Sequence, residues 1–239
     1  MRRARQESGG FLVEGLRSIA EAVALGMKPR ILLYGEAASG HPLLREAVAK
    51  AAETLKVSDA ILTKISRREN PQTVLAVFDQ MKANLSEVDS AAARCWIGLE
   101  AVRDPGNLGT IIRTADACGC GGVILIGDCC DPFSVEAVRA TMGSIFALPV
   151  ILTSQEDFLI WRQTWPGAVV GTLLSAKTDF RDAPYRDPSL VLMGNEQTGL
   201  TSTLAEVCDL SVKIPMLGRA DSLNLAVATG IMVYAVAGR

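Results

Sequence analysis

The 239-residue sequence has one histidine, no long hydrophobic run and no cysteine pair at metal-ligand spacing. Its six cysteines include no CxxC pair, which argues against zinc, and a chain of this length rarely relies on a disulfide framework. No apolar run reaches the roughly 18 residues that would cross a membrane, and no apolar segment of a secretory signal follows the first arginines. We therefore expect a cytoplasmic protein with reduced thiols, no metal and no membrane partner.

Charge is low overall but unevenly distributed. The net charge is −2, so the chain as a whole is not a basic nucleic-acid-binding protein. Residues 1–94 carry 14 Lys and Arg against 11 Asp and Glu, whereas residues 95–239 carry 10 against 15. This asymmetry fits an RNA-binding module beside a catalytic one, and equally an ordinary solvated surface. The candidate RNA contacts in the basic part are Arg2, Arg3, Arg5, Arg67 and Arg68.

The first part of the chain alternates short apolar runs with amphipathic segments. This alternation predicts a small α/β domain over residues 1–80 and a linker of polar and small residues at 81–94. The predicted strands are 11–15, 31–35 and 71–79, and the predicted helices are 16–26 and 41–55.

A second alternation fills residues 95–239. Its six apolar runs look like strands buried on both faces, which predicts an α/β fold with a mostly parallel sheet. Polar motifs follow the first, fifth and sixth runs, at the carboxyl ends of the strands, where open α/β sheets bind ligands. The predicted strands are 95–102, 121–127, 148–152, 168–175, 190–194 and 210–216, and the predicted helices are 109–118, 134–146, 155–164 and 222–238.

The first motif is DPGNLGTIIRTADACG, which starts at Asp104. It is not GxGxxG, so the fingerprint of a dinucleotide-binding enzyme is missing. Asn107 lies between two glycines and is a good N-cap residue, and Arg113 follows beside the core face of the helix. The alternative for Arg113 is a solvent-exposed side chain paired with Asp116.

The second and third motifs are LVLMGNEQTGL and IPMLGRADSLNLAVATG. Gly194 allows a ligand to approach the backbone closely, and Glu196 lies in a turn where its carboxylate could cap the next helix. Ser222 is a candidate N-cap of the last, apolar helix. Asn224 is harder to explain structurally, because a buried amide needs hydrogen-bond partners.

Together, the three motifs resemble the signatures of the SpoU family of RNA 2′-O-ribose methyltransferases, in the SPOUT superfamily, in the family's order and spacing. The resemblance is strong over residues 95–239, and Ala226, where relatives often have serine, is a small departure. It implies a C-terminal sheet with a deep trefoil knot and a homodimer with the active site at or near the subunit interface. The segment SGGFLVEGLRSIAEAVALG resembles the family's substrate-binding domain, which has a ribosomal-protein-like α/β fold.

The chemistry that the resemblance implies is methyl transfer from S-adenosylmethionine to an RNA ribose 2′-hydroxyl, without a metal. The only histidine, His41, lies in the N-terminal domain, whereas the family pattern puts Arg113 at the catalytic position. Arg113 would accept the hydroxyl proton while a substrate phosphate tunes it, or would stay charged and stabilise the developing alkoxide. The residues implied to orient Arg113, the ribose or the cofactor are Asn107, Glu196, Ser222 and Asn224. The positions implied to hold the cofactor are Leu192, Gly194, Ile214, Met216, Gly218 and Leu223.

Large-subunit (23S) ribosomal RNA is the expected substrate, because stand-alone tRNA enzymes of the family often lack the N-terminal domain. A tRNA 2′-O-methyltransferase is the alternative within the family. A non-catalytic RNA-binding or ribosome-assembly factor is a further alternative, which the intact set of polar motif residues argues against. A NAD-dependent enzyme is disfavoured by the missing fingerprint.

Overall fold

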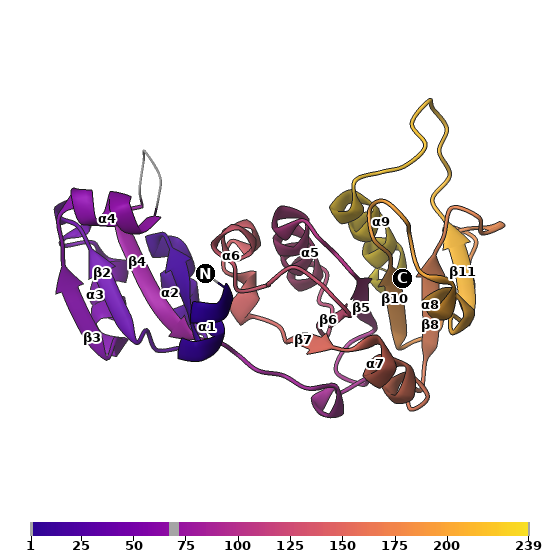
Figure 1. Cartoon of the computed structure of the whole chain (residues 1–239), viewed down its shortest axis with the longest axis horizontal. Helices are drawn as coiled ribbons and strands as arrows, with labels where there is room; N and C mark the ends of the chain where they lie inside the picture. The colour runs from indigo at the N-terminus through magenta and orange to yellow at the C-terminus, as the bar shows by residue number, and fades with distance from the viewer. Residues whose placement is uncertain (1, 67–71, 239) are drawn as a thin grey trace. The chain divides into compact units, whose positions relative to one another are not determined.

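The computed structural model describes residues 2–66 and 72–238, apart from the side chains of Arg2 and Ala4. The chain folds into two compact units (Figure 1). Unit 1 contains the chain up to Met81 together with residues 131–147, and unit 2 contains residues 82–130 and 148 onwards. The sequence assigned residues 131–147 to the C-terminal domain, whereas this segment packs within unit 1.

Unit 1 is built on a four-stranded mixed sheet in the order β1-β4-β2-β3. β4 pairs antiparallel with β1 and β2, and β3 pairs parallel with β2. The small α/β domain expected from the sequence is present. Its elements are α1 (Arg2–Ser8), β1 (Gly10–Glu14), α2 (Leu16–Ala24), β2 (Ile31–Tyr34), a 3₁₀ turn (Glu36–Ala38), α3 (Pro42–Lys50), β3 (Glu53–Lys56), α4 (Asp59–Ser66), β4 (Val74–Asp79), α6 (Val135–Thr141) and a 3₁₀ turn (Ser144–Phe146).

Two predicted helices of unit 1 are shorter than expected. The helix predicted over 41–55 ends at Lys50, and the residues after it form β3, because backbone pairing with β2 overrides their local helix preference. The helix predicted over 134–146 stops at Thr141, because Met142 and Gly143 both have positive φ. Gly143 has a φ of +105°, a conformation that L side chains rarely adopt, which favours glycine in this left-handed turn.

Phenylalanine rings join residues 131–147 to the core of unit 1. Phe11 on β1 lies with its ring centroid 4.9 Å from that of Phe133 and 5.7 Å from that of Phe146. Phe78 on β4 meets Phe146 edge-on at 5.0 Å. Such pairs stabilise beyond the area that they bury. The segment 131–147 is therefore part of the hydrophobic core of unit 1.

Unit 2 is built on a seven-stranded sheet in the order β7-β6-β5-β10-β8-β11-β9. Every pairing in this sheet is parallel, as the sequence predicted. All residues of β5 and β10 are buried, which matches their unbroken apolar runs. Its elements are a 3₁₀ turn (Leu85–Glu87), β5 (Cys95–Glu100), α5 (Pro105–Ala117), β6 (Val123–Ile126), β7 (Val150–Thr153), α7 (Gln155–Arg162), β8 (Ala168–Thr172), β9 (Thr178–Asp179), β10 (Ser189–Met193), α8 (Ser202–Glu206), β11 (Leu210–Lys213) and α9 (Leu225–Ala237).

Helices α5 and α9 lie side by side in unit 2 (Figure 1). α9 is apolar along most of its length and buries Met232, Val233 and Val236 completely. In the described part of the chain, no helix has the length and apolar character needed to span a bilayer.

Helix α5 begins four residues earlier than predicted. Asp104 is its N-cap, and the carboxylate of Asp104 accepts a hydrogen bond from the backbone N–H of Asn107 at 2.6 Å. Pro105 occupies the first turn. Proline fits there because its missing N–H would have no helical partner. Asn107 is therefore inside the helix, and the N-cap role expected for it belongs to Asp104. This shift leaves the Asn107 side chain free to contact other elements.

Candidate active site

The candidate site lies at the carboxyl edge of the sheet of unit 2. β5 and β10 are direct neighbours, so the first motif, after β5, and the second, after β10, emerge side by side. β11 lies two strands from β10, with β8 between them. The third motif follows β11 and ends in α9, which packs against α5. The fold thus brings together three segments that are far apart in the sequence.

A hydrogen-bonded chain of three side chains links the motifs. Asn224 donates from Nδ2 to Oδ1 of Asn107 at 2.9 Å, and Asn107 donates from Nδ2 to Oε1 of Glu196 at 3.0 Å. Oδ1 of Asn224 also accepts from the amides of Ala226 and Val227, which makes Asn224 the N-cap of α9. We call Asn107, Glu196 and Asn224 the polar chain. The polar chain holds Oε1 of Glu196 at the carboxyl edge of the sheet.

An open cavity of about 740 Å³ surrounds the polar chain. Its wall also includes Arg103, Asp104 and Asn195. Arg103 forms an ion pair with Asp128 at 2.5 Å, and both side chains are largely exposed. The cavity therefore offers amide and carboxylate groups that suit the hydroxyls of a sugar, beside a positive charge.

Two of the predicted catalytic residues, Arg113 and Ser222, are not part of the polar chain. Arg113 is exposed on α5, six residues or about 9 Å along the helix axis beyond Asn107. In the described part of the chain its side chain makes no hydrogen bond or ion pair, so the alternative pairing with Asp116 is absent. Ser222 is also exposed and donates only to the carboxylate of Asp221, at 3.2 Å. Asn224, and not Ser222, caps the last helix.

The predicted cofactor positions divide between the end of β10 and the loop from β11 to α9. Leu192 and Gly194 are buried, Ile214 and Met216 are half-buried, and Gly218 and Leu223 are exposed. The loop extends away from the sheet in Figure 1. Gly194 has a structural reason to be glycine, because a Cβ there would lie 2.0 Å from the backbone of Gly199 and Leu200. The close approach that the sequence suggested for a ligand is thus made by the protein itself.

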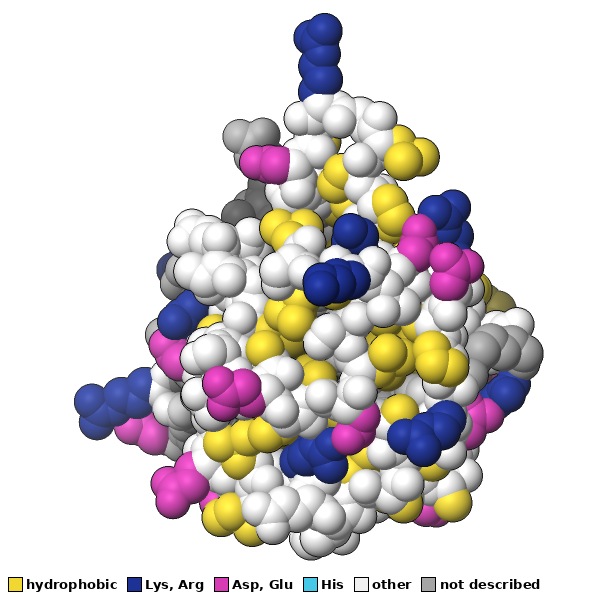
Figure 2. Space-filling model, turned by 90° about the vertical axis from the view of Figure 1, so that its right-hand side faces the viewer, with side chains coloured by type: hydrophobic (Ala, Val, Ile, Leu, Met, Phe, Trp, Pro, Cys, Tyr) yellow, Lys and Arg dark blue, Asp and Glu magenta, His cyan; other side chains and the backbone are white. Residues whose placement is uncertain are grey.

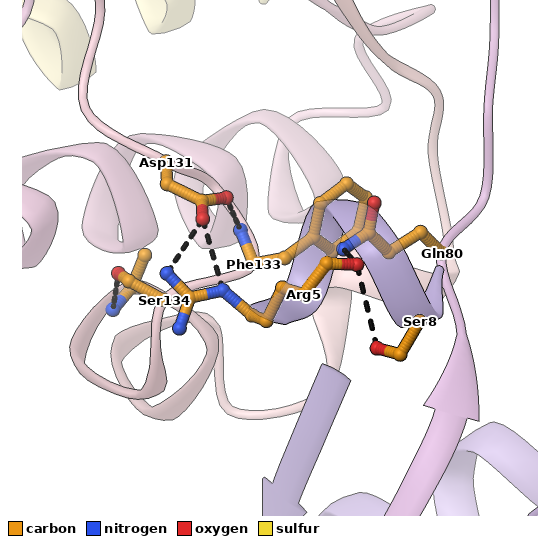
Figure 3. Close-up of polar contacts among 7 residues, drawn as sticks. Arg5, Ser8, Gln80, Asp131, Phe133 and Ser134 are labelled. Atoms are coloured by element: carbon orange, nitrogen blue, oxygen red, sulfur yellow. Dashed lines mark hydrogen bonds and ion pairs between the residues drawn. The ribbon is translucent and has the colours of Figure 1, made fainter. Parts of the chain in front are cut away.

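The predicted RNA contacts of unit 1 differ in their surroundings. Arg5 binds Oδ2 of Asp131 through Nε and Nη2, at 2.9 and 2.6 Å, with both side chains about 85% covered (Figure 3). Arg3 is 90% exposed and pairs with Glu7 one helical turn away. Arg5 is therefore an internal anchor for Asp131, and its assignment as an RNA contact stays a prediction. The side chain of Arg2, and Arg67 and Arg68 as a whole, lie outside what the structure describes.

The surface and the thiols give two further constraints. On the face shown in Figure 2, the Lys and Arg side chains are scattered among acidic and apolar ones, without a continuous basic patch among the described residues.

Burial raises the pKa of the Cys130 thiol to about 12, and the nearby carboxylates of Asp104 and Glu196 add to this. The thiol therefore stays protonated at neutral pH. The described residues contain no cluster of three His, Cys, Asp or Glu side chains suited to a metal.

Sequence reasoning gave no role to Glu100, Asp104, Asn195 and Thr201, which shape the site. The Asp-Pro pair before an apolar helical pattern is a usable signal for an N-cap followed by proline. Thr201 was detectable in the same way, as the N-cap of α8. Asn195 carries the local signal of an Asx turn, whereas its contact with Ala101 and the contact of Glu100 with Thr201 join segments that are far apart in the sequence.

Family comparisons cover most of the chain. The model of the SpoU rRNA Methylase family matches residues 94–234, and that of the MRM3-like substrate binding domain matches residues 1–76. The sequence is 33% identical to a 23S rRNA (uridine(2479)-2′-O)-methyltransferase of Streptomyces viridochromogenes, over all of this chain and 86% of the relative. It is 31% identical to the 23S rRNA (guanosine(2553)-2′-O)-methyltransferase RlmP of Bacillus subtilis, over 98% of this chain and 91% of the relative.

A solved structure agrees with these matches. The AdoMet-bound rRNA methyltransferase from Sinorhizobium meliloti superposes with a TM-score of 0.91 at 42% identity, covering 99% of this chain and 90% of that one. The similarity therefore extends over both units and includes all three motifs.

Proposed function

The chain belongs to the SpoU rRNA methylase family, and from this premise we propose that it transfers a methyl group from S-adenosylmethionine to a ribose 2′-hydroxyl of 23S ribosomal RNA. The observation that supports this most directly is the polar chain, because it joins one residue from each family motif at the end of a parallel sheet. A ribosomal RNA substrate also implies a cytoplasmic site of action.

The loop before α9 fits S-adenosylmethionine by its chemistry. Its half-buried Ile214 and Met216, with the exposed Leu217 and Leu223, offer apolar surface to an adenine ring. In the described structure, residues 214–223 make no backbone–backbone hydrogen bonds. Their amides and carbonyls are therefore available to the polar edges of the cofactor. Leu192 and Gly194 would border the same site from β10, and Gly218 would allow the loop to turn close to it.

The residues of this chain have separate tasks in the proposed reaction. When bound, S-adenosylmethionine supplies an activated methyl group on a sulfonium. The polar chain orients the ribose, and Glu196 accepts a hydrogen bond from a ribose hydroxyl. Ser222, on the loop before α9, helps to orient the ribose or the cofactor. A guanidinium keeps its proton in proteins, so we assign Arg113 the role of a permanent cation that stabilises the developing alkoxide.

Substrate recognition is assigned to unit 1. The match of residues 1–76 to a substrate-binding domain supports RNA binding there. Arg3 is the predicted contact that the structure shows to be exposed. Both curated relatives described above carry names of 23S rRNA enzymes, which favours ribosomal RNA over tRNA.

We further propose a homodimer and a trefoil knot, as the family resemblance implies. A groove of about 600 Å³ runs between α5 and α9, and Val227 and Tyr234 on α9 are more than half exposed. A second copy of the chain would cover these apolar side chains and bring another subunit close to Arg113. Replacing Val227 with Glu would place a charge in that interface, and sedimentation should then show monomers. Wild-type protein that sediments as a monomer would contradict the dimer.

The test of function measures the transfer of labelled methyl from S-adenosylmethionine to unmodified 23S rRNA and to bulk tRNA. We expect label in the rRNA only, mapped to a ribose, and none with Arg113→Ala. Arg94→Ala is the matched control, because Arg94 is an exposed arginine at the opposite end of β5, paired with Asp187.

The outcomes separate the remaining alternatives. Label in tRNA alone would keep the chemistry and overturn the substrate. Cofactor binding without label in either RNA would favour the non-catalytic assembly factor. Full activity of Arg113→Ala would refute the catalytic assignment.

A further inference from the structure

We propose that Asn195 and Glu100 are positioning residues, which hold the loop from β10 to α8 so that the Glu196 carboxylate meets Asn107. This inference deepens the proposed function and rests on it. Neither residue lies in the polar chain, and both act on Glu196 through the backbone of its loop.

Asn195 uses both ends of its amide. Nδ2 donates to the carbonyl oxygen of Ala101 at 2.8 Å, which ties the end of β10 to the end of β5. Oδ1 accepts from the amide of Gln197 at 2.9 Å, which folds the backbone into a turn with Glu196 at its apex. The direction of the Glu196 side chain is therefore set by the residue that precedes it.

The loop is also closed by its own backbone. Asn195 and Gly199 exchange two hydrogen bonds, from each amide to the other carbonyl, at 3.1 and 2.9 Å. Ala101, which receives the Asn195 side chain, has a φ of +49°, a left-handed conformation unusual for alanine. Non-glycine residues adopt this conformation at a cost in free energy, so the surrounding structure, including the Asn195–Ala101 hydrogen bond, must hold Ala101 in it.

Glu100 fixes the far end of the same loop. Its side chain is 6% exposed, and its two oxygens accept from the amide and the hydroxyl of Thr201, at 2.8 and 2.7 Å. In the described structure Glu100 has no ion-pair partner. Burying a carboxylate without a cation is costly and a poor way to gain stability. A role in fixing the loop geometry explains why a charge stands there.

The first experiment replaces Asn195 with Ser. Serine can still accept from the Gln197 amide but is too short to reach Ala101, so the turn stays and the anchor is lost. Because a small misplacement of a catalytic group is costly, we expect kcat to fall about 10- to 100-fold, with the dissociation constant of S-adenosylmethionine unchanged within about twofold. In a Glu196→Ala background, Asn195→Ser should change kcat by less than about twofold.

The second experiment compares two substitutions of Glu100. Gln keeps one acceptor for the Thr201 amide and offers an N–H to its hydroxyl, so Glu100→Gln should retain kcat within about threefold. Ala offers no acceptor to the amide and the hydroxyl of Thr201, so Glu100→Ala should lose about as much activity as Asn195→Ser. Equal loss in the Gln and Ala variants would contradict a positioning role.

The matched control is Ser189→Ala. Ser189 is buried at the opposite end of β10, where its hydroxyl donates to the Arg186 carbonyl at 2.7 Å. Its removal costs a buried hydrogen bond on the same strand without touching the loop. Ser189→Ala should therefore lower the melting temperature and leave kcat unchanged. If it reduces kcat as much as Asn195→Ser does, the effect is one of stability and the proposal fails.

A readout without turnover separates this inference from the proposed function. The side-chain amide signals of Asn107 in NMR spectra report its hydrogen bond to Glu196. They should shift and exchange faster with water in Asn195→Ser and Glu100→Ala, and stay unchanged in Ser189→Ala. Unchanged Asn107 signals in all variants would overturn the positioning role. A wild-type protein without methyl transfer would overturn only the proposed function.

Discussion

Arg5 in unit 1 and Arg113 in unit 2 have the same charge in opposite settings. Arg5 is mostly covered and is bound to Asp131 through two nitrogens, whereas Arg113 is exposed and its side chain makes no hydrogen bond or ion pair in the described structure. An arginine that is already neutralised and buried contributes to the fold, and its release would leave a carboxylate without its partner. An exposed arginine without a partner, on the helix that also carries Asn107, is available to a substrate. Position in the sequence alone did not separate these two roles.

The largest expected effect sharpens the Arg113 side of this comparison. Arg113→Lys keeps the positive charge but replaces the planar fork with a flexible point charge. We expect kcat to fall at least about 100-fold, as for the loss of an aligned group that stabilises transition-state charge. Single-turnover methylation assays would measure this, with the melting temperature recorded in parallel. A lysine variant with near wild-type kcat would show that charge alone suffices.

The second effect tests the Arg5 side. Arg5→Ala leaves the carboxylate of Asp131 half-buried without a cation, so the free energy of unfolding of unit 1 should drop by about 2–3 kcal/mol. Urea denaturation would measure it. Arg3→Ala is the control, because the exposed Arg3–Glu7 pair should contribute less than about 1 kcal/mol. If RNA affinity fell in Arg5→Ala while stability did not, Arg5 would be an RNA contact after all.

The smallest effect concerns the thiols near the cavity. With a pKa of about 12 for Cys130, raised chiefly by burial, the reactive thiolate is a very small fraction at pH 8. Alkylation of folded protein at Cys130 should therefore be slow and rise about tenfold per pH unit, since the thiolate fraction does. In urea, where the pKa returns to about 8.5, the same cysteine should react quickly. Fast modification of native Cys130 would contradict this burial effect.

The parallel sheet of unit 2 could be predicted because six of its seven strands lie in apolar runs, whereas β9 is the polar pair Thr178–Asp179 and was not predicted. The start of α5 and the end of α3 were missed for different reasons. The Asp-Pro pair at 104 and 105 is a local signal for the start of α5, whereas β3 forms only because β2 offers it a partner. Local preference cannot reveal pairing between distant segments.

The site was predictable in the same uneven way. The motifs identified Asn107, Glu196 and Asn224, but the order in which these side chains bond depends on how β5, β10 and α9 meet. The contacts of Glu100 with Thr201 and of Asn195 with Ala101 could not be predicted, because the partners lie 101 and 94 residues away in the sequence. The burial of Arg5 was equally hidden, since Asp131 is 126 residues away.

The packing of residues 131–147 into unit 1 has a consequence for synthesis on the ribosome. The rings of Phe133 and Phe146 complete the aromatic core around Phe11, so the first unit cannot finish folding when only its first 81 residues have emerged. It must wait until β5, α5 and β6 of the second unit have been translated. The two units therefore cannot be exchanged as continuous segments of sequence. A fragment that ends at the linker would lack Phe133 and Phe146 and leave the hydrophobic core of unit 1 incomplete.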